Sequence, residues 1–183
     1  VVVHNSTFAS NRAASKIDST NGGAIWIGER AQLDLRGGAL VNNAASMGGA
    51  LYINRDGRVS IAPSSAGGAP ARIAGNSADF GGGIWSEGVL EITGAQISGN
   101  LVPSTTELLG IGGGVVNWLG TLTMTATLVD SNVGRYGGGV FAGELRFKGA
   151  AQRVRAHGAN GAASSTLIRS STLSNNLAGA EGG

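Results

Sequence analysis

Residues 76–86 read NSADFGGGIWS: an Asn, a short mixed segment, three glycines and a short apolar segment. The same order recurs along the chain. Glycine pairs or triplets followed by apolar residues begin at positions 22, 48, 81, 112 and 137, so successive units are 26, 33, 31 and 25 residues apart. Repetition at this spacing is typical of solenoid proteins. The chain is therefore predicted to repeat one structural unit.

A second motif places an apolar residue three positions before an Asn, and it alternates with the glycine motif. Its asparagines are Asn11, Asn43, Asn76, Asn100, Asn132 and Asn176. Between the two motifs lie segments such as residues 33–35 and 90–92, where apolar and polar residues alternate as in half-buried strands. One unit thus holds three short strands in about 25 residues.

Three short strands cannot bury their own apolar face, so successive units must stack on each other. The sequence therefore predicts an all-β fold, a right-handed single-stranded parallel β-helix of about six or seven coils, with residues 1–183 as one domain. The first glycine of each unit is expected at positive φ in a tight corner. Each recurrent Asn is expected to adopt a left-handed conformation and to bond to the Asn one coil away, so the six asparagines form a structural ladder.

The segment from residue 143 to residue 176 is less regular, with an irregular coil or loop at 149–165. Val154 and His157 fit the second motif with His in place of Asn, which predicts one more coil between those of Asn132 and Asn176. Residues 2–11 and 167–176 match position for position. The chain is therefore expected to begin and end in mid-coil, as a segment of a longer β-helix or as a subunit that stacks end to end.

Composition excludes several classes of function. The 183 residues include 33 glycines and no cysteine, 13% are charged, and the formal net charge is +2. No run of Lys and Arg follows the spacing of phosphates, so nucleic acid is not an expected partner. No apolar run approaches the roughly 20 residues of a transmembrane helix. The lack of cysteine excludes disulfides and thiolate metal sites.

The acidic residues are dispersed, and this argues against catalysis. The outward position of the alternating strand is predicted to carry Asp34, Ser60, Glu91, Thr123 and Arg146 in successive coils, so neighbouring coils do not place two carboxylates together. A groove that gathers Glu87, Glu91 and Arg146 is the alternative, because polysaccharide cleavage needs converging acids. His4 and His157 lack metal-ligand spacing. The sequence predicts no catalytic site, metal or cofactor.

One column of aromatic residues stands out. If the flanking aliphatic residues point inward, the middle residue of each glycine-rich strand points outward. This position holds Trp26, Tyr52, Trp85, Val116 and Phe141. Neighbouring rings would lie about 4.8 Å apart. Three interpretations stay open: a structural aromatic ladder, an exposed stripe that binds a protein partner, and a surface that stacks on sugar rings.

The alternation of the two motifs, clearest at residues 43–53 and 76–85, resembles the repeats of chlamydial polymorphic outer-membrane proteins and related bacterial autotransporter passengers and adhesin-like proteins. The resemblance covers nearly the whole chain. It implies secretion, display at the bacterial cell surface and often adhesion. The expected function is a non-catalytic extracellular scaffold with an adhesive or assembly role, whose partners are other protein subunits, further copies of itself or a glycan. The alternative is a pectin-lyase-like lyase or hydrolase acting on a surface glycan.

Overall fold

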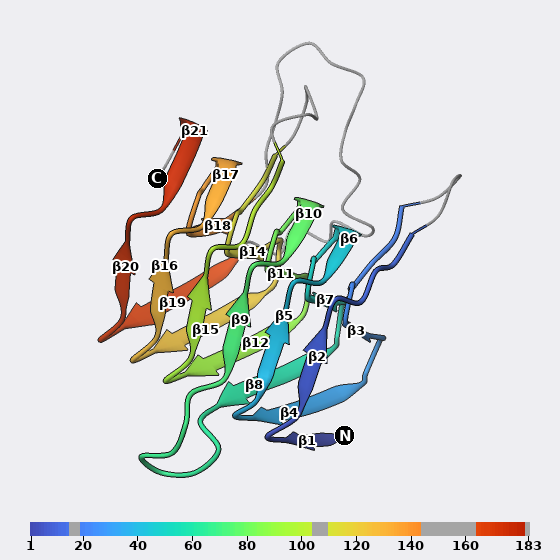
Figure 1. The fold of residues 1–183 in the computed structure, drawn as a ribbon, viewed down its shortest axis with the longest axis vertical. Helices are drawn as coiled ribbons and strands as arrows, with labels where there is room; N and C mark the ends of the chain where they lie inside the picture. Colours follow the sequence, from blue (N-terminus) through green and yellow to red (C-terminus); the bar gives the residue numbers. More distant parts are fainter. Residues whose placement is uncertain (15–18, 104–109, 144–163, 182–183) are drawn as a thin grey trace.

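Short parallel strands stacked in four sheets make up the fold, and the chain visits these sheets in the same order in each coil (Figure 1). The computed structural model describes residues 1–14, 19–103, 110–143 and 164–181. All strand pairings among them are parallel. The predicted all-β fold, a parallel β-helix, is confirmed.

The two larger sheets each contain six strands. Sheet A contains β1 (Val2–His4), β4 (Gln32–Arg36), β8 (Arg58–Ala62), β12 (Val89–Thr93), β15 (Thr121–Thr125) and β19 (Ser165–Arg169). Sheet B contains β2 (Thr7–Ala9), β5 (Ala39–Val41), β9 (Arg72–Ala74), β13 (Gln96–Ser98), β16 (Leu128–Asp130) and β20 (Thr172–Ser174). These are the alternating strand and the strand before the Asn, as predicted, and they define six coils.

The other two sheets follow the Asn in each coil. Sheet C contains β6 (Ala44–Met47), β10 (Ser77–Phe80), β17 (Val133–Tyr136) and β21 (Leu177–Glu181), with single bridges through Leu101 and Ile111 in the fourth coil. Sheet D contains the glycine-rich strands β3 (Ile25–Ile27), β7 (Leu51–Ile53), β11 (Ile84–Ser86), β14 (Val115–Asn117) and β18 (Val140–Ala142). Sheet C was not predicted, because its strands lack a consistent alternation of apolar and polar residues.

The prediction of an extra coil between those of Asn132 and Asn176 is wrong. Strand β15 pairs directly with β19, and β16 pairs directly with β20. The position after β15 in sheet A, which the sequence assigned to the strand of Arg146, is therefore taken by β19. His157 and Arg146 themselves lie outside the described residues. The segment after β18 is thus an insertion between two adjacent coils, since the chain then returns to the next position in sheet A.

A ladder of asparagines runs through the six coils, as predicted, and its four inner members are buried: Asn43, Asn76, Asn100 and Asn132. The Oδ1 of Asn76 accepts hydrogen bonds from the backbone N and the Nδ2 of Asn43, at 2.8 and 3.0 Å. The Nδ2 of Asn76 donates to Asn100 Oδ1 and to the carbonyl oxygen of Leu40 in the coil below, both at 2.9 Å. The same pattern links the other five ladder asparagines. The apolar residue of the second motif thus supplies both a core side chain and a carbonyl acceptor.

The left-handed residue of this corner is the one before the ladder Asn. Positive φ occurs at Asn42 (55°), Gly75 (64°) and Ser131 (55°), and none of the six ladder asparagines has it. The prediction that the ladder asparagines themselves adopt this conformation is therefore wrong by one position. The ladder side chain must point inward to reach its neighbours, so the preceding residue makes the turn.

The repeated glycine pair has two different causes. Gly48 has φ of 62°, which opens the corner before β7 and confirms the predicted role of the first glycine. Gly49 has no such φ, but a Cβ there would overlap the carbonyl oxygen of Gly82 in the next coil. Side chains are therefore excluded at the second position by the close stacking of the coils.

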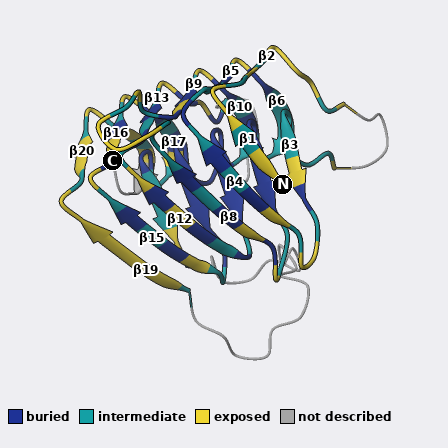
Figure 2. Cartoon of the chain, turned by 90° about the horizontal axis from the view of Figure 1, so that it is seen from below, coloured by how far each residue is buried: buried dark blue, intermediate teal, exposed yellow. Residues whose placement is uncertain are grey.

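The interior of the coils is filled by aliphatic side chains from sheets A, B and D. Leu35, Leu40, Leu51 and Ile61 are fully or almost fully buried in one cluster. Figure 2 shows buried residues in the middle strands of sheet A, whereas β19 is exposed along its length. Residues 2–11 and 167–176 pass through sheets A and B in the same way, which confirms their predicted equivalence.

We predict that Asn76→Ala lowers the free energy of unfolding by about 3 kcal/mol, because it removes four hydrogen bonds and leaves buried groups of Asn43 and Leu40 without partners. Asn11→Ala is the matched control. Its side chain is exposed and donates one hydrogen bond, so we expect a loss of about 1 kcal/mol. Urea unfolding followed by circular dichroism measures both, and equal losses would contradict a stabilising role for the buried ladder.

Candidate functional site

The predicted aromatic column exists, but most of it is covered. Trp26, Tyr52, Trp85, Val116 and Phe141 lie in register in successive strands of sheet D. Tyr52 and Trp85 belong to a second apolar cluster, separate from the interior, so they point outward from the sheet as expected. Their exposed fractions are nevertheless only 6% and 1%. A contiguous exposed stripe is therefore excluded, and burial favours the structural interpretation of the column.

Trp118 completes this outer cluster and was missed by the sequence prediction. Its ring stacks on Trp85, with ring centres 5.3 Å apart, and on Phe141, at 6.3 Å. Phe80, from sheet C, meets the edge of Trp85 at 6.0 Å. Val116 is the one small residue of the column, and Trp118 bridges the aromatic rings on either side of it. Its position two residues after Val116, directly after the end of β14, was the available signal, because residues i and i+2 of an extended segment share a face.

Glu87 is the polar partner of the outer cluster. The same carboxylate oxygen, Oε1, accepts hydrogen bonds from Tyr52 Oη and Trp85 Nε1, each at 3.0 Å. Burial raises the pKa of the Tyr52 hydroxyl, and the charge of Glu87 and its hydrogen bond raise it further. Glu87 thus serves the buried aromatic residues rather than the groove with Glu91 and Arg146 that the sequence offered as an alternative. Arg146 lies outside the described residues.

Substitutions of Trp85 and Trp26 compare a covered residue of the aromatic column with an exposed one. We expect Trp85→Ala to lower the free energy of unfolding by about 3–5 kcal/mol, because a large side chain leaves a packed cluster. Trp26 is 54% exposed, and Trp26→Ala should change stability by less than about 0.5 kcal/mol. Thermal unfolding measures both variants. Similar stability of the two would contradict the covered arrangement.

Tyr52 makes stability sensitive to alkaline pH. Its pKa in the folded chain is raised above the ordinary value of 10.0, so its contribution is complete below about pH 10 and is lost as pH rises beyond that value. We predict that the wild-type chain loses more stability between pH 9 and pH 11 than Tyr52→Phe does, as measured by urea unfolding at each pH. Tyr136→Phe is the control, because within the described ranges the Tyr136 hydroxyl has no hydrogen bond to a carboxylate. Parallel losses in the wild type and Tyr52→Phe would contradict the assignment.

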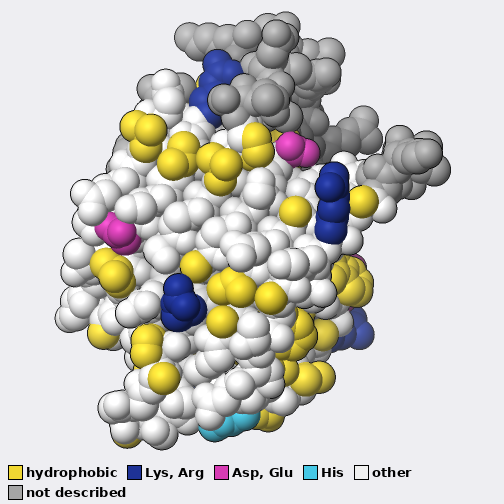
Figure 3. Space-filling model, viewed as in Figure 1, with side chains coloured by type: hydrophobic (Ala, Val, Ile, Leu, Met, Phe, Trp, Pro, Cys, Tyr) yellow, Lys and Arg dark blue, Asp and Glu magenta, His cyan; other side chains and the backbone are white. Residues whose placement is uncertain are grey.

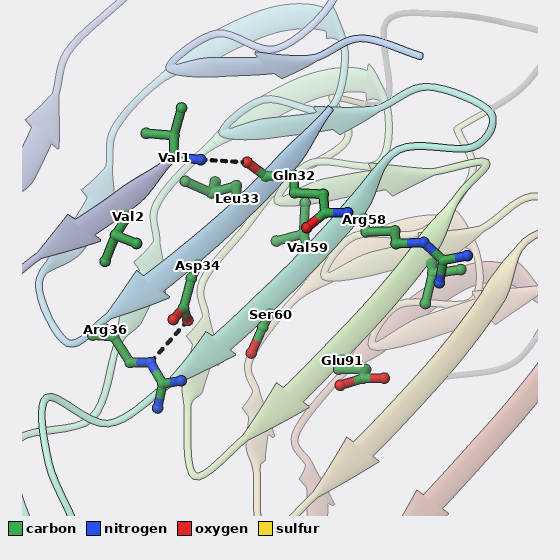
Figure 4. A pocket seen from close by; sticks show the side chains of 11 residues that line it. Val1, Val2, Gln32, Leu33, Asp34, Arg36, Arg58, Val59, Ser60 and Glu91 are labelled. Carbon is green, nitrogen blue, oxygen red and sulfur yellow. Dashed lines mark hydrogen bonds and ion pairs between the residues drawn. The ribbon is translucent and has the colours of Figure 1, made fainter. Parts of the chain in front are cut away.

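A hollow of about 400 Å³ lies on the outer face of sheet A (Figure 4). It exists because the third coil supplies small side chains where its neighbours supply large ones. Ser60 stands in register between Asp34 and Glu91. In the neighbouring outward column, Ala62 of β8 stands in register beside Arg36 of β4. We call this site the sheet A hollow, and its lining includes Val2, Gln32, Asp34, Arg36, Arg58, Ser60, Val89 and Glu91.

The side chains that line the sheet A hollow include two acids and two arginines, so their formal charges cancel. The amino group of Val1 also lines it and donates to the carbonyl oxygen of Gln32 at 2.8 Å. Arg36 Nε donates to Asp34 Oδ1 at 2.8 Å. Among the described residues, the side chains of Arg58, Glu91 and Ser60 have no hydrogen-bond partner. Sequence analysis placed Asp34, Ser60 and Glu91 in one outward column correctly. It did not find Arg58, because the column beside it was not considered.

The outer face of sheets B and C, here named the B–C face, carries little charge (Figure 3). The sequences of its ten strands contain five charged residues: Arg72, Asp79, Asp130, Arg135 and Glu181. Asp130 accepts hydrogen bonds from Ser131, Ser174 and Asn175, which lower its pKa. Three leucines stand exposed on this face: Leu101 (42%), Leu128 (36%) and Leu177 (60%). Leu101 and Leu177 both flank Val133 in register.

No family model matches the chain, and neither the curated proteins nor the solved structures contain a match to it. Within the described ranges, three or more His, Cys, Asp or Glu side chains do not gather as metal ligands would. His4 lies on β1, and His157 is outside those ranges. The described residues also contain no helix with the length and apolar character needed to cross a membrane.

Proposed function

We propose that the chain is a non-catalytic β-helix scaffold, secreted or displayed on a bacterial cell surface, with an adhesive or assembly role. The resemblance of its repeats to surface passengers supports the compartment. The observation that carries the role is the B–C face, where exposed leucines stand among small uncharged residues such as Ala39, Ala74 and Ser98. Leu101 and Leu177 flank Val133 in register, and contiguous exposed apolar patches mark interaction sites.

The same proposal includes stacking of a further coil, of this protein or of a second copy, on the coil of β19 and β20. Ile168 and Leu173 are in register with the buried residues Met124 and Val129 of the preceding coil. They are nevertheless 38% and 46% exposed. Apolar side chains and strand edges that are open in this way favour addition of another coil.

Charges placed on the B–C face test the assembly role. In Leu101→Glu/Leu128→Glu we expect affinity for the partner, or for a second copy, to fall at least tenfold, which corresponds to about 1.4 kcal/mol. Thermal stability should change little, since both side chains are exposed. Sedimentation velocity measures self-association, and binding to a panel of extracellular-matrix proteins and cell surfaces measures adhesion.

Leu167→Glu is the matched control, because Leu167 is 41% exposed but lies on sheet A. It should retain any binding that depends on the B–C face. A wild-type chain that stays monomeric at high concentration and binds none of these surfaces would overturn the proposal. Equal loss in the control would instead place the interface elsewhere.

A second candidate is a glycan-active enzyme of the pectin-lyase-like type. It is favoured by the sheet A hollow, where Asp34 and Glu91 lie two coils apart, about 9.6 Å between Cα atoms at ordinary strand spacing. Inverting glycosidases hydrolyse a glycosidic bond with two carboxyl groups roughly 6.5–9.5 Å apart, of which one donates a proton and the other activates water. Asp34, however, is paired with Arg36, which leaves one fewer free acid.

A further inference from the structure

The sheet A hollow is a concave site on the outer face of sheet A. Its floor is Ser60, with Asp34 and Glu91 before and after it along the coil axis (Figure 4). Arg58 and Val89 stand in register in the neighbouring column. The volume of about 400 Å³ suits a small polar ligand or a short section of a polymer.

Polar groups in the hollow are available to a ligand. Glu91 and Arg58 are exposed, and within the described structure neither side chain forms a hydrogen bond or an ion pair. Ser60 adds a hydroxyl that can donate or accept. Arg36 uses Nε for Asp34, which leaves the other carboxylate oxygen of Asp34 as an acceptor. The hollow therefore offers both hydrogen-bond donors and acceptors to a ligand.

The balance of charge indicates the class of ligand. A polyanion would meet Asp34 and Glu91, and a polycation would meet Arg36 and Arg58, so both are disfavoured by like charges. A neutral ligand rich in hydroxyl groups can donate to the carboxylates and accept from the guanidinium groups. Val2 and Val89 offer apolar contacts beside these polar groups, as the C–H face of a sugar ring requires.

We propose that the sheet A hollow binds a neutral oligosaccharide without cleaving it, with the sugar chain lying along the coil axis. The columns of sheet A run in this direction, from Val2 to Glu91 over three strand spacings, or about 14 Å. This inference rests on the adhesive role proposed above and names the ligand class of that role. The site lies on a different sheet from the B–C face, so the two are tested by different substitutions.

Titration calorimetry with the full chain provides the test. The probes are neutral tetrasaccharides of glucose, mannose, galactose and N-acetylglucosamine, and tetragalacturonate as the acidic counterpart. We expect at least one neutral probe to bind at least tenfold more tightly than tetragalacturonate. Glu91→Gln and Arg58→Gln should each weaken binding about tenfold or more, because each removes hydrogen bonds made by a charged group. Ser60→Tyr, which fills the hollow, should abolish binding.

Thr123→Tyr is the matched control, because Thr123 follows Glu91 in the same column and does not line the hollow. It should bind as the wild type does, and circular dichroism should show that all variants are folded. Failure of every neutral probe, preference for tetragalacturonate, or wild-type binding by Ser60→Tyr would overturn the inference. Release of reducing ends from a bound probe would overturn it in favour of the enzyme. If Leu101→Glu/Leu128→Glu loses assembly while the wild-type chain binds no glycan, the scaffold proposal stands and this inference fails.

Discussion

The asparagine ladder is the interaction on which the rest of the structure depends. A buried amide without partners is costly, and each internal ladder Asn avoids this cost only if the coils above and below are in register. Its Oδ1 accepts hydrogen bonds from the Asn of the previous coil, and its Nδ2 donates to a carbonyl group of the previous coil and to the Asn of the next coil. The ladder therefore aligns every strand of the four sheets, since all four are connected through the same coils.

Fixed register turns the surface into columns of side chains, and the size of each residue then decides the local shape. On sheet A, Ser60 between Asp34 and Glu91 produces a hollow. On sheet D, Val116 in an aromatic column leaves room for Trp118. Both features come from one small residue among larger neighbours. A repeat protein can thus create distinct sites without changing its backbone.

The two proposed binding surfaces use different physical chemistry. The B–C face offers exposed leucines and few charges, which suits a protein partner. The sheet A hollow offers charged and hydroxyl groups of balanced sign, which suits a neutral sugar. Glu87 does not join the hollow, because it holds Tyr52 and Trp85 on sheet D. An adhesive scaffold could use both surfaces at once, since they lie on separate sheets.

The sequence by itself determined the parallel β-helix, the ladder asparagines and the outward direction of the aromatic column, because these depend on local spacing and on the period of two along a strand. It could not determine that Asn132 is followed directly by Asn176, because the length of an insertion does not reveal whether it forms a coil. Only the tertiary structure decided that Tyr52 and Trp85 are covered and that Asp34, Arg58 and Glu91 surround Ser60. Burial and concavity depend on neighbouring coils about 30 residues away in the chain, which no local pattern specifies.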